Sequence, residues 1–341
     1  MGDALLERQL LDRTGRRVED VVDAVAGLNA QTARGPSVGL WSRISGFRQD
    51  SLDERLRDYQ LVKANLMRGT VHLVTAGQFR RWRAALQPAL RRTVRQFCPR
   101  LHLAVDINAV VGKGIELLAA AEGGLTRPEL ARQLAPGFDA DPQECAFAVR
   151  LLAPVVQAAD PSVWRPGQTR YVLAESVLGP LAGPVEEDDE AGLANLLATY
   201  LRAFGPATAA DAAYWSGRTR LGPALAALSD ASASGHGAAA RFDVAGDEPR
   251  SPRRSFALPE YDNIFFAHKE NSFTTAKKRL IYTKSALMRG SLLMDGQVVA
   301  AWHREAGSDD LTLLPWVDEL PDEAAAEFEE LRTFYASASS R

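Results

Sequence analysis

Two amide side chains, Asn29 and Gln31, lie in the stretch GLNAQTARGPSVGLW at 27–41. They follow valines at helical spacing, which predict an amphipathic helix from about residue 17 to residue 28. Residues two apart in a regular helix point to nearly opposite sides, but a frayed end before Gly35-Pro36 can turn both amides toward one cavity. The plain alternative is a helix C-terminus whose amides bond stray backbone carbonyls.

Residue types that build metal sites and nucleophilic triads are sparse in this sequence. It has no P-loop, no GxGxxG after a strand, no HExxH and no GxSxG, and its five histidines show no ligand spacing. Cys98 and Cys145 form no CxxC, so we expect two reduced thiols and no cysteine metal site. We therefore expect no metal and no cofactor. The acidic candidates for a base are Asp20, Asp23, Glu260 and Asp262.

The segment around the amides is predicted to be a helical unit that ends in a strand. Beyond the valine helix, a short helix is expected at 3–13 and an amphipathic one at 52–67. RGTVHLV at 68–74 alternates β-branched residues, which is typical of a strand. A long basic helix is expected at 79–95, with Pro88 as a kink or break. Helices followed by a strand are the order of a winged helix.

The same order is expected twice more, without visible sequence similarity between the copies. In the second copy, Thr126-x-x-Glu129 predicts a capping box, a third helix runs to about residue 158, and Pro166-Gly167 marks a wing hairpin. In the third copy, Thr208-x-x-Asp211 caps a helix, and a strand RFDVA follows the flexible segment SASGHGAAA.

Short strand patterns dominate from Phe256 onward, with Asp295-Gly296 as a hairpin signal and an acidic helix at 319–334. The expected fold class is mainly α with β (α+β), with three tandem winged-helix motifs and a small C-terminal antiparallel β-barrel-like domain. The expected domains are winged helices at 1–107, 108–185 and 186–250, followed by a β-rich domain at 251–341.

The composition is that of a soluble globular protein. With 46% hydrophobic and 24% charged residues, no run of 18 apolar residues and no N-terminal leader, we expect a cytoplasmic protein without a membrane partner. Nothing indicates a dimerisation helix, so we expect a monomer. Arginine outnumbers lysine by 34 to 6, which indicates a GC-rich bacterial genome.

The formal net charge of −3 hides an uneven distribution. Residues 59–105 contain nine basic residues and no acid, a second acid-free window covers 271–294, and acid collects at 186–190 and 318–330. A charge run is most often a solvated face, but two long windows of one sign favour a surface that binds a polyanion such as DNA. The residues predicted to contact it are Arg34, Arg68, His72, Arg80, Arg81, Arg83, Arg91, Arg92, Arg95, Lys277, Lys278 and Arg279.

Five stretches, in order along the chain, resemble one family: the winged-helix superfamily of bacterial interstrand-crosslink DNA glycosylases, with its AlkZ-like and YcaQ-like branches. The resemblance implies three tandem winged helices and a C-terminal barrel-like part that hold duplex DNA on a concave basic surface. The stretches are LNAQTARGPSVGLWSRI (28–44), LMRGTVHLV (66–74), FGPATAADAAYWSG (204–217), LPEYDNIFFAHK (258–269) and MDGQVVAAWHRE (294–305).

The resemblance also implies a site and a reaction. The family's active motif, Gln, an aliphatic residue and then Gln or Asp, falls on Asn29-Ala30-Gln31. Asn29 and Gln31 are therefore the expected catalytic residues, and Asn29 is one methylene shorter than the usual Gln. The implied reaction is metal-independent, monofunctional hydrolysis of the N-glycosidic bond of an alkylated purine, crosslinked or not. Such an enzyme can provide DNA repair or self-resistance to a DNA-alkylating natural product.

Two other interpretations stay open from the sequence alone. Winged helices mostly bind DNA without chemistry, so a non-catalytic DNA-binding regulator is the first alternative. A scaffold that uses its basic face for acidic proteins is the second. Salt-dependent duplex binding separates the scaffold from the others, and release of an alkylated base separates the enzyme from the regulator.

Overall fold

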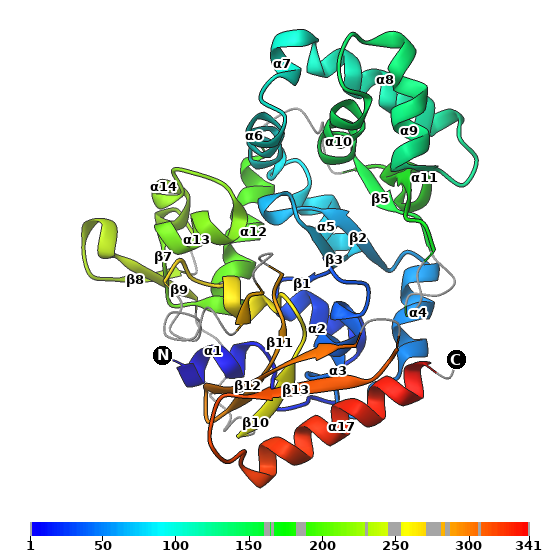
Figure 1. The fold of residues 1–341 in the computed structure, drawn as a ribbon. Helices are drawn as coiled ribbons and strands as arrows, with labels where there is room; N and C mark the ends of the chain where they lie inside the picture. Colours follow the sequence, from blue (N-terminus) through cyan, green and yellow to red (C-terminus); the bar gives the residue numbers. More distant parts are fainter. Residues whose placement is uncertain are drawn as a thin grey trace.

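The computed structural model describes residues 2–159, 164, 167–181, 189–228, 231–244, 254–270, 281–283, 287–305 and 308–339. Helices surround several small antiparallel sheets, so the fold is mixed α/β (Figure 1). No helix of this described part of the chain is long and apolar enough to cross a membrane.

The N-terminal unit is built around a three-stranded antiparallel sheet of strand order β1-β3-β2. Strand β3 lies in the middle and pairs with both neighbours along the same residues. In chain order the elements are α1 (Gly2–Arg8), α2 (Val18–Ala24), β1 (Leu28–Asn29), α3 (Gly35–Trp41), α4 (Gln49–Arg57), β2 (Leu61–Asn65), η1 (Met67–Gly69), β3 (Val71–Thr75), α5 (Ala76–Trp82) and α6 (Gln87–Phe97).

Each of two long helices expected in this unit is interrupted in the structure. The helix expected at 52–67 is α4 followed by the strand β2, because Tyr59 takes a left-handed φ of +53° that ends the helix. The helical spacing of apolar residues continues by chance across this junction. The helix expected at 79–95 is two helices, α5 and α6, so the break expected near Pro88 is confirmed; Pro88 lies in the first turn of the second helix, where proline is well tolerated.

The middle of the chain repeats the three-stranded arrangement twice, in sheets of order β4-β6-β5 and β7-β9-β8. Each sheet contains a first strand of two residues that pairs with the last strand. In chain order the elements are α7 (Leu101–Ala104), α8 (Ile107–Ala120), β4 (Leu125–Thr126), α9 (Arg127–Leu134), η2 (Ala135–Gly137), α10 (Pro142–Leu152), β5 (Val155–Gln157), β6 (Arg170–Leu173), α11 (Ala174–Leu178), α12 (Glu190–Phe204), β7 (Ala207–Thr208), α13 (Ala209–Ser216), α14 (Gly222–Ala226), β8 (Ala231–Ser234), η3 (Gly237–Ala239) and β9 (Arg241–Val244).

The capping boxes expected in these two units are confirmed. The Thr126 hydroxyl accepts the N–H of Glu129 and the Thr208 hydroxyl accepts that of Asp211, while each carboxylate accepts the N–H of its threonine. Two other expectations were wrong. Helix α10 ends at Leu152, not near 158, because β5 follows, and part of the segment expected to be flexible forms β8. Pro166 lies outside the described residues.

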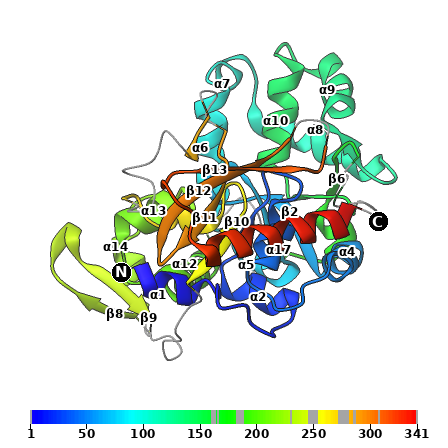
Figure 2. The ribbon, with the colours of Figure 1, turned by 60° about the horizontal axis from the view of Figure 1, so that its bottom comes forward.

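The C-terminal part is a four-stranded antiparallel sheet of order β10-β11-β12-β13. Asp295 and Gly296 form the expected hairpin, both with positive φ as a type I′ turn requires. Helix α17 packs against β10 and β11 and crosses the sheet (Figure 2). Among the described strands, β10 and β13 are the two edges. The elements are β10 (Ser255–Leu258), η4 (Asn263–Phe266), β11 (Gly290–Met294), β12 (Gln297–Arg304), β13 (Leu311–Pro315) and α17 (Asp322–Ser339).

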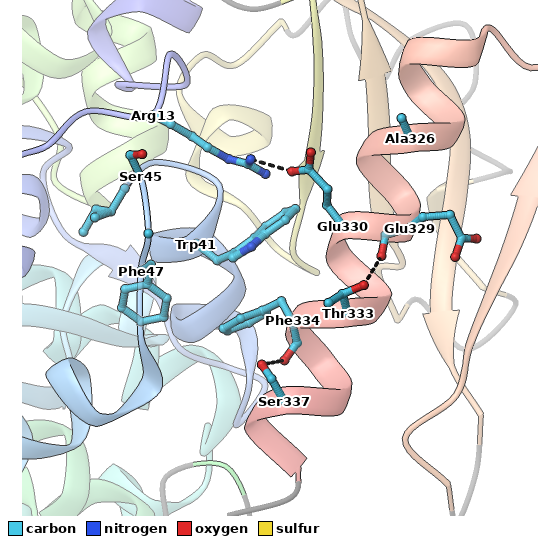
Figure 3. Close-up of a pocket in the computed structure, with 12 residues that line it drawn as sticks. Arg13, Trp41, Ser45, Phe47, Ala326, Glu329, Glu330, Thr333, Phe334 and Ser337 are labelled. Atoms are coloured by element: carbon cyan, nitrogen blue, oxygen red, sulfur yellow. Dashed lines mark hydrogen bonds and ion pairs between the residues drawn. The ribbon is translucent and has the colours of Figure 1, made fainter.

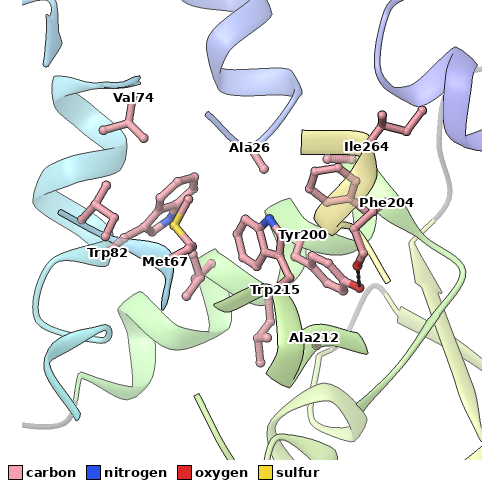
Figure 4. Close-up of a cluster of buried hydrophobic side chains, with 14 of the residues drawn as sticks. Ala26, Met67, Val74, Trp82, Tyr200, Phe204, Ala212, Trp215 and Ile264 are labelled. Atoms are coloured by element: carbon pink, nitrogen blue, oxygen red, sulfur yellow. Dashed lines mark hydrogen bonds between the residues drawn. The ribbon is translucent and has the colours of Figure 1, made fainter. Parts of the chain in front are cut away.

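One buried cluster joins the first unit to the third (Figure 4). Trp82 of α5 and Met67 of η1 lie in the same cluster as Tyr200, Phe204 and Trp215, from α12 and α13. The three aromatic side chains stack at centroid distances of 5.0 to 5.9 Å. Burial of such large side chains is the main stabilising term between the two units.

A second buried cluster joins the first unit to the C-terminal sheet. Val21 of α2 and Leu40 of α3 share it with Trp302 of β12 and Tyr335 of α17. The Trp302 indole N–H donates to the Leu258 carbonyl at 3.0 Å, so its polar atom is satisfied. The sheet and the N-terminal helices thus share one hydrophobic core.

An ion pair without solvent access crosses this second interface. Arg43, just after α3, donates both guanidinium nitrogens to the two carboxylate oxygens of Asp262 at 3.0 Å each, and both side chains are 0% exposed. Asp262 also accepts the Ile264 N–H at 3.1 Å and so caps η4. Arg43 donates further to the Gly39 carbonyl. The pair therefore fixes α3 to the turn before η4.

Replacing Asp262 with Asn should lower the free energy of unfolding by about 3–5 kcal/mol, because it leaves the buried guanidinium of Arg43 without its counter-charge. Urea denaturation measures the loss. Asp20→Asn is the matched control, since Asp20 forms a surface pair with Arg17 and should change stability by less than about 1 kcal/mol. A loss as small as the control's in Asp262→Asn would contradict this role.

Candidate active site

The first strand of the N-terminal sheet carries the amide motif. After α2, Ala26 and Gly27 take left-handed φ values of +61° and +79°, which turn the chain into β1. A Cβ at Gly27 would lie 2.8 Å from a Val74 methyl carbon, so only glycine fits against β3 here. Asn29 is therefore the last residue of a strand, and its predicted place at a frayed helix end was wrong.

The three small sheets place Asn29 at a position equivalent to Thr126 and Thr208. Each is the second residue of a two-residue first strand, and each pairs with the last strand of its sheet. The two threonines cap the helix that begins at the next residue. Asn29 instead accepts the Gln31 N–H through Oδ1 at 3.0 Å, and α3 begins only at Gly35. A loop at 30–34 thus takes the place of the first helical turn.

Asn29 and Gln31 contact each other through their side chains. Asn29 Nδ2 donates to Gln31 Oε1 at 3.2 Å. Asn29 is 6% exposed, whereas Gln31 is exposed. The two amides therefore contact each other, with Asn29 as the buried anchor and Gln31 as the solvent-facing group, and the expectation that both turn toward one cavity stays a prediction. Two adjoining amides offer both donors and acceptors and can hold a polar molecule such as water.

Asn263 holds the backbone of the motif strand from the C-terminal part. Its Oδ1 accepts the Asn29 N–H at 3.1 Å, and its Nδ2 donates to the Gly27 carbonyl. Asn263 directly follows Asp262 of the buried ion pair. The sequence analysis missed this residue, although it lies in the stretch LPEYDNIFFAHK that carries the family resemblance.

His72 lies directly opposite Asn29 on β3. It is 1% exposed, and its Nδ1 lies 2.9 Å from the Thr70 carbonyl. Burial, with Arg68 as a lesser cause, lowers the pKa of His72 to about 3, so the imidazole is neutral at physiological pH. Its predicted contact with DNA is not available in this structure, because the side chain is enclosed beneath the motif.

Several arginines predicted to bind DNA donate instead to carbonyls at helix C-termini. Arg83 is 2% exposed and donates to the last carbonyls of α10 and the next residue, and burial lowers its pKa to about 9. Arg80 donates to the Leu178 carbonyl at the end of α11. Arg68 and Arg92 donate to the carbonyls of Trp215 and Gly217 at the end of α13. These cations complement helix dipoles.

Arg34 is also engaged inside the protein. Its guanidinium lies 2.5 Å from Asp309 and donates through Nε to the Trp164 carbonyl at 3.2 Å. It lies over the Trp164 ring at 4.7 Å from the centroid. Arg34 therefore links the motif loop to the C-terminal part, and its predicted DNA contact would need these bonds to open.

Arg81, Arg91 and Arg95 are at least partly exposed, as the predicted contact with DNA requires. Arg81 is about half exposed and lies 4.0 Å from Asp23. Arg91 donates to the Asn108 side chain at 3.1 Å, and Arg95 is exposed one helical turn further along α6. Arg91, Arg95 and Arg92, which is exposed although it also donates to the Gly217 carbonyl, form a basic face of α6. Lys277, Lys278 and Arg279 lie outside the described residues.

A groove of the described structure lies away from the amides. It has a volume of about 620 Å³ and runs between the end of α3 and α17, where Trp41 and Phe47 face Phe334 (Figure 3). Arg13 crosses it, 4.3 Å above the Trp41 ring and 2.6 Å from Glu330. Asn29 and Gln31 do not line this groove, and Gln31 is exposed on the loop that follows β1.

Metal and thiol chemistry find no support in the part of the chain that the structure describes. Within it, no group of three or more His, Cys, Asp or Glu residues is placed to hold a metal ion. Cys98 and Cys145 are buried free thiols, and burial raises the pKa of Cys98 to about 11. Both thiols are therefore protonated and poor nucleophiles at neutral pH.

A mixed α/β chain with repeated three-stranded units and an amide pair at the end of a first strand fits the expected class, a DNA glycosylase. The family model of the DNA glycosylase AlkZ-like family matches residues 22–334, and the chain belongs to this family. Its fold is similar to that of Streptomyces sahachiroi DNA glycosylase AlkZ, with a TM-score of 0.76, 17% identity, and coverage of 99% of this chain and 95% of that one. A comparison with curated protein sequences gave no match.

Replacing Arg91, Arg92 and Arg95 with Ala should weaken duplex binding and flatten its dependence on salt. Each lost phosphate contact lowers the slope of log affinity against log salt by about 0.9, so the triple variant should lose up to about 3. Binding titrations at several salt concentrations measure it. Arg332→Ala on α17 is the control, because Arg332 is half exposed and pairs with Glu329. An unchanged slope in the triple variant would contradict this surface.

Proposed function

We propose that this DNA glycosylase hydrolyses the N-glycosidic bond of an alkylated purine in duplex DNA, with Gln31 and Asn29 as its catalytic residues. The observation that carries the proposal is the bond from Asn29 Nδ2 to Gln31 Oε1, which holds an exposed amide at a rigid strand end. A buried, backbone-anchored Asn29 gives the exposed Gln31 a fixed direction toward solvent.

Two neutral amides suffice for this reaction because of the leaving group. A purine alkylated at N7 or N3 is already cationic and leaves without protonation, so no general acid is needed. The transition state carries positive charge at C1′, which the phosphates of the DNA stabilise. The enzyme then has to place a water, which Gln31 and Asn29 hold beside C1′. Neither metal nor cofactor takes part, and the product is an abasic site.

An open site suits a bulky lesion. A large adduct or a crosslinked base cannot rotate into a tight pocket, which ordinary base flipping requires. Gln31 is exposed on its loop, which supports an open approach of the lesion. We propose bulky alkylpurines, crosslinked or not, as substrates, and self-resistance to a DNA-alkylating natural product as the biological role.

Three tandem winged helices are our proposal for how the duplex is held. The units at 1–107, 108–185 and 186–250 each contain a three-stranded sheet of the same pairing order, which supports this division. The part at 251–341, proposed as the barrel-like domain, braces the motif through Asn263. We propose a monomer that contacts phosphates through the basic face of α6.

The direct test is incubation with a duplex that carries a defined N7-alkylguanine. We expect free alkylated base and an abasic site in equal amounts, with activity retained in EDTA. Tight, salt-dependent duplex binding without any base release would instead favour a non-catalytic DNA-binding protein.

Gln31→Ala should leave duplex affinity nearly unchanged and lower single-turnover base release by roughly 10² or more, the scale of a lost catalytic contact. Asn29→Gln restores the family pattern, and we expect equal or faster release where the site accepts one more methylene. Gln143→Ala is the control, because Gln143 is an exposed amide at the start of α10. Full rate in Gln31→Ala would contradict the amide mechanism.

A further inference from the structure

The loop at 30–34 contacts the turn before η4. The Thr32 hydroxyl donates to Glu260 Oε2 at 3.4 Å. A Cβ at Gly35 would lie 2.7 Å from Thr32 Oγ1 and 3.8 Å from the Glu260 carbonyl, so glycine lets the loop and the turn pack closely. Gln31 is the residue next to Thr32, and its position depends on this contact.

Glu260 is a carboxyl group in an unusual setting. Among the described residues, the Thr32 hydroxyl is the side-chain group that donates to it. Desolvation by burial raises the pKa of Glu260 above its ordinary value, against the favourable charges of Arg304 on β12 and Arg34 on the loop. Tyr335 of α17 also faces it and stays neutral, because burial raises the pKa of that phenol. A desolvated carboxyl beside a catalytic loop is typical of a functional group.

We propose that Glu260 is a positioning residue for base release: its carboxylate, through Thr32, fixes the loop that presents Gln31 to the lesion. This inference rests on the proposed function of Gln31. The tight approach of Gly35 and the bond to Thr32 place Glu260 behind the loop, while Asn263, three residues later, holds the strand before it. The short segment at 260–263 thus contacts both β1 and the loop at 30–34.

The ionised form is the one that acts. The carboxylate accepts the hydrogen bond that the Thr32 hydroxyl donates and adds negative potential beneath a site where positive charge develops. Protonation removes that charge and makes the group a competing donor. Tyr335 remains neutral, because burial raises the pKa of its phenol, and a cationic purine needs no proton to leave. The fall of the rate in acid therefore follows the protonation of Glu260.

Stability should change in the opposite direction to activity. A carboxyl whose folded pKa is raised contributes stability below its unfolded pKa and loses it as the pH rises through the folded value. The ionised form of Glu260 is therefore the one that favours folding less, and Glu260→Gln should leave the thermal unfolding temperature unchanged or raise it. If the Glu260 carboxylate only stabilised the fold, Glu260→Gln would instead lower the thermal unfolding temperature.

Single-turnover release of N7-methylguanine from duplex DNA, measured from about pH 5 to 8, tests the proposal. We expect Glu260→Gln to lower the rate about tenfold at neutral pH, remove the fall in acid and leave duplex affinity unchanged. Thr32→Val should lose as much, whereas Thr32→Ser keeps the hydroxyl and the rate. Glu329→Gln, on an exposed part of α17, is the control and should match the wild type.

A wild-type rate and pH dependence in Glu260→Gln would overturn the inference, and so would equal losses in Thr32→Ser and Thr32→Val. If Glu260→Gln fails to fold, the comparison of Thr32→Ser with Thr32→Val still tests the inference. Absence of base release by the wild-type protein, or full rate in Gln31→Ala, would instead overturn the proposed function. Impaired Gln31→Ala beside wild-type behaviour in Glu260→Gln refutes only the role of Glu260.

Discussion

The arrangement of the candidate site depends on the buried ion pair between Arg43 and Asp262. Both side chains are fully enclosed, and the carboxylate also caps η4, so the turn before η4 has one permitted position against α3. From that turn Asn263 bonds the backbone on both sides of Leu28, and Glu260 bonds the loop that follows. An unpaired charge at this depth is strongly unfavourable, which makes the geometry stringent. The C-terminal sheet is thus part of the site, although the amides lie near the N-terminus.

Local signals in the sequence predicted much of the fold. The capping boxes at Thr126 and Thr208 and the hairpin at Asp295-Gly296 are short-range chemistry, so they could be recognised without tertiary information. The strand β1 could not, because two residues have no period and its existence depends on β3 pairing. The sequence singled out both amides as candidates, but their side-chain contact depends on the turn at Gly27 and the bonds from Asn263, which no local pattern reveals.

The basic window at 59–105 shows why charge patterns overpredict contacts with DNA. The absence of acids in the sequence suggested uncompensated arginines, yet Arg83, Arg80 and Arg68 are satisfied by carbonyls at the ends of α10, α11 and α13. A helix C-terminus presents unpaired carbonyls that no residue type reveals. These arginines join the units of the protein, so within this window of the described chain the proposal of phosphate contacts rests on the exposed face of α6 and on Arg81.

The central claim is that Asn29 and Gln31 act as one unit on a single water. A double-mutant cycle with Asn29→Ala, Gln31→Ala and the combined variant, measured as single-turnover release of an N7-alkylguanine, tests it most directly. The account predicts strong non-additivity, with the combined variant no slower than Gln31→Ala alone, because the water is already lost in the single variant. Losses that multiply, so that the combined variant is slower by the product of the two single effects, would contradict it.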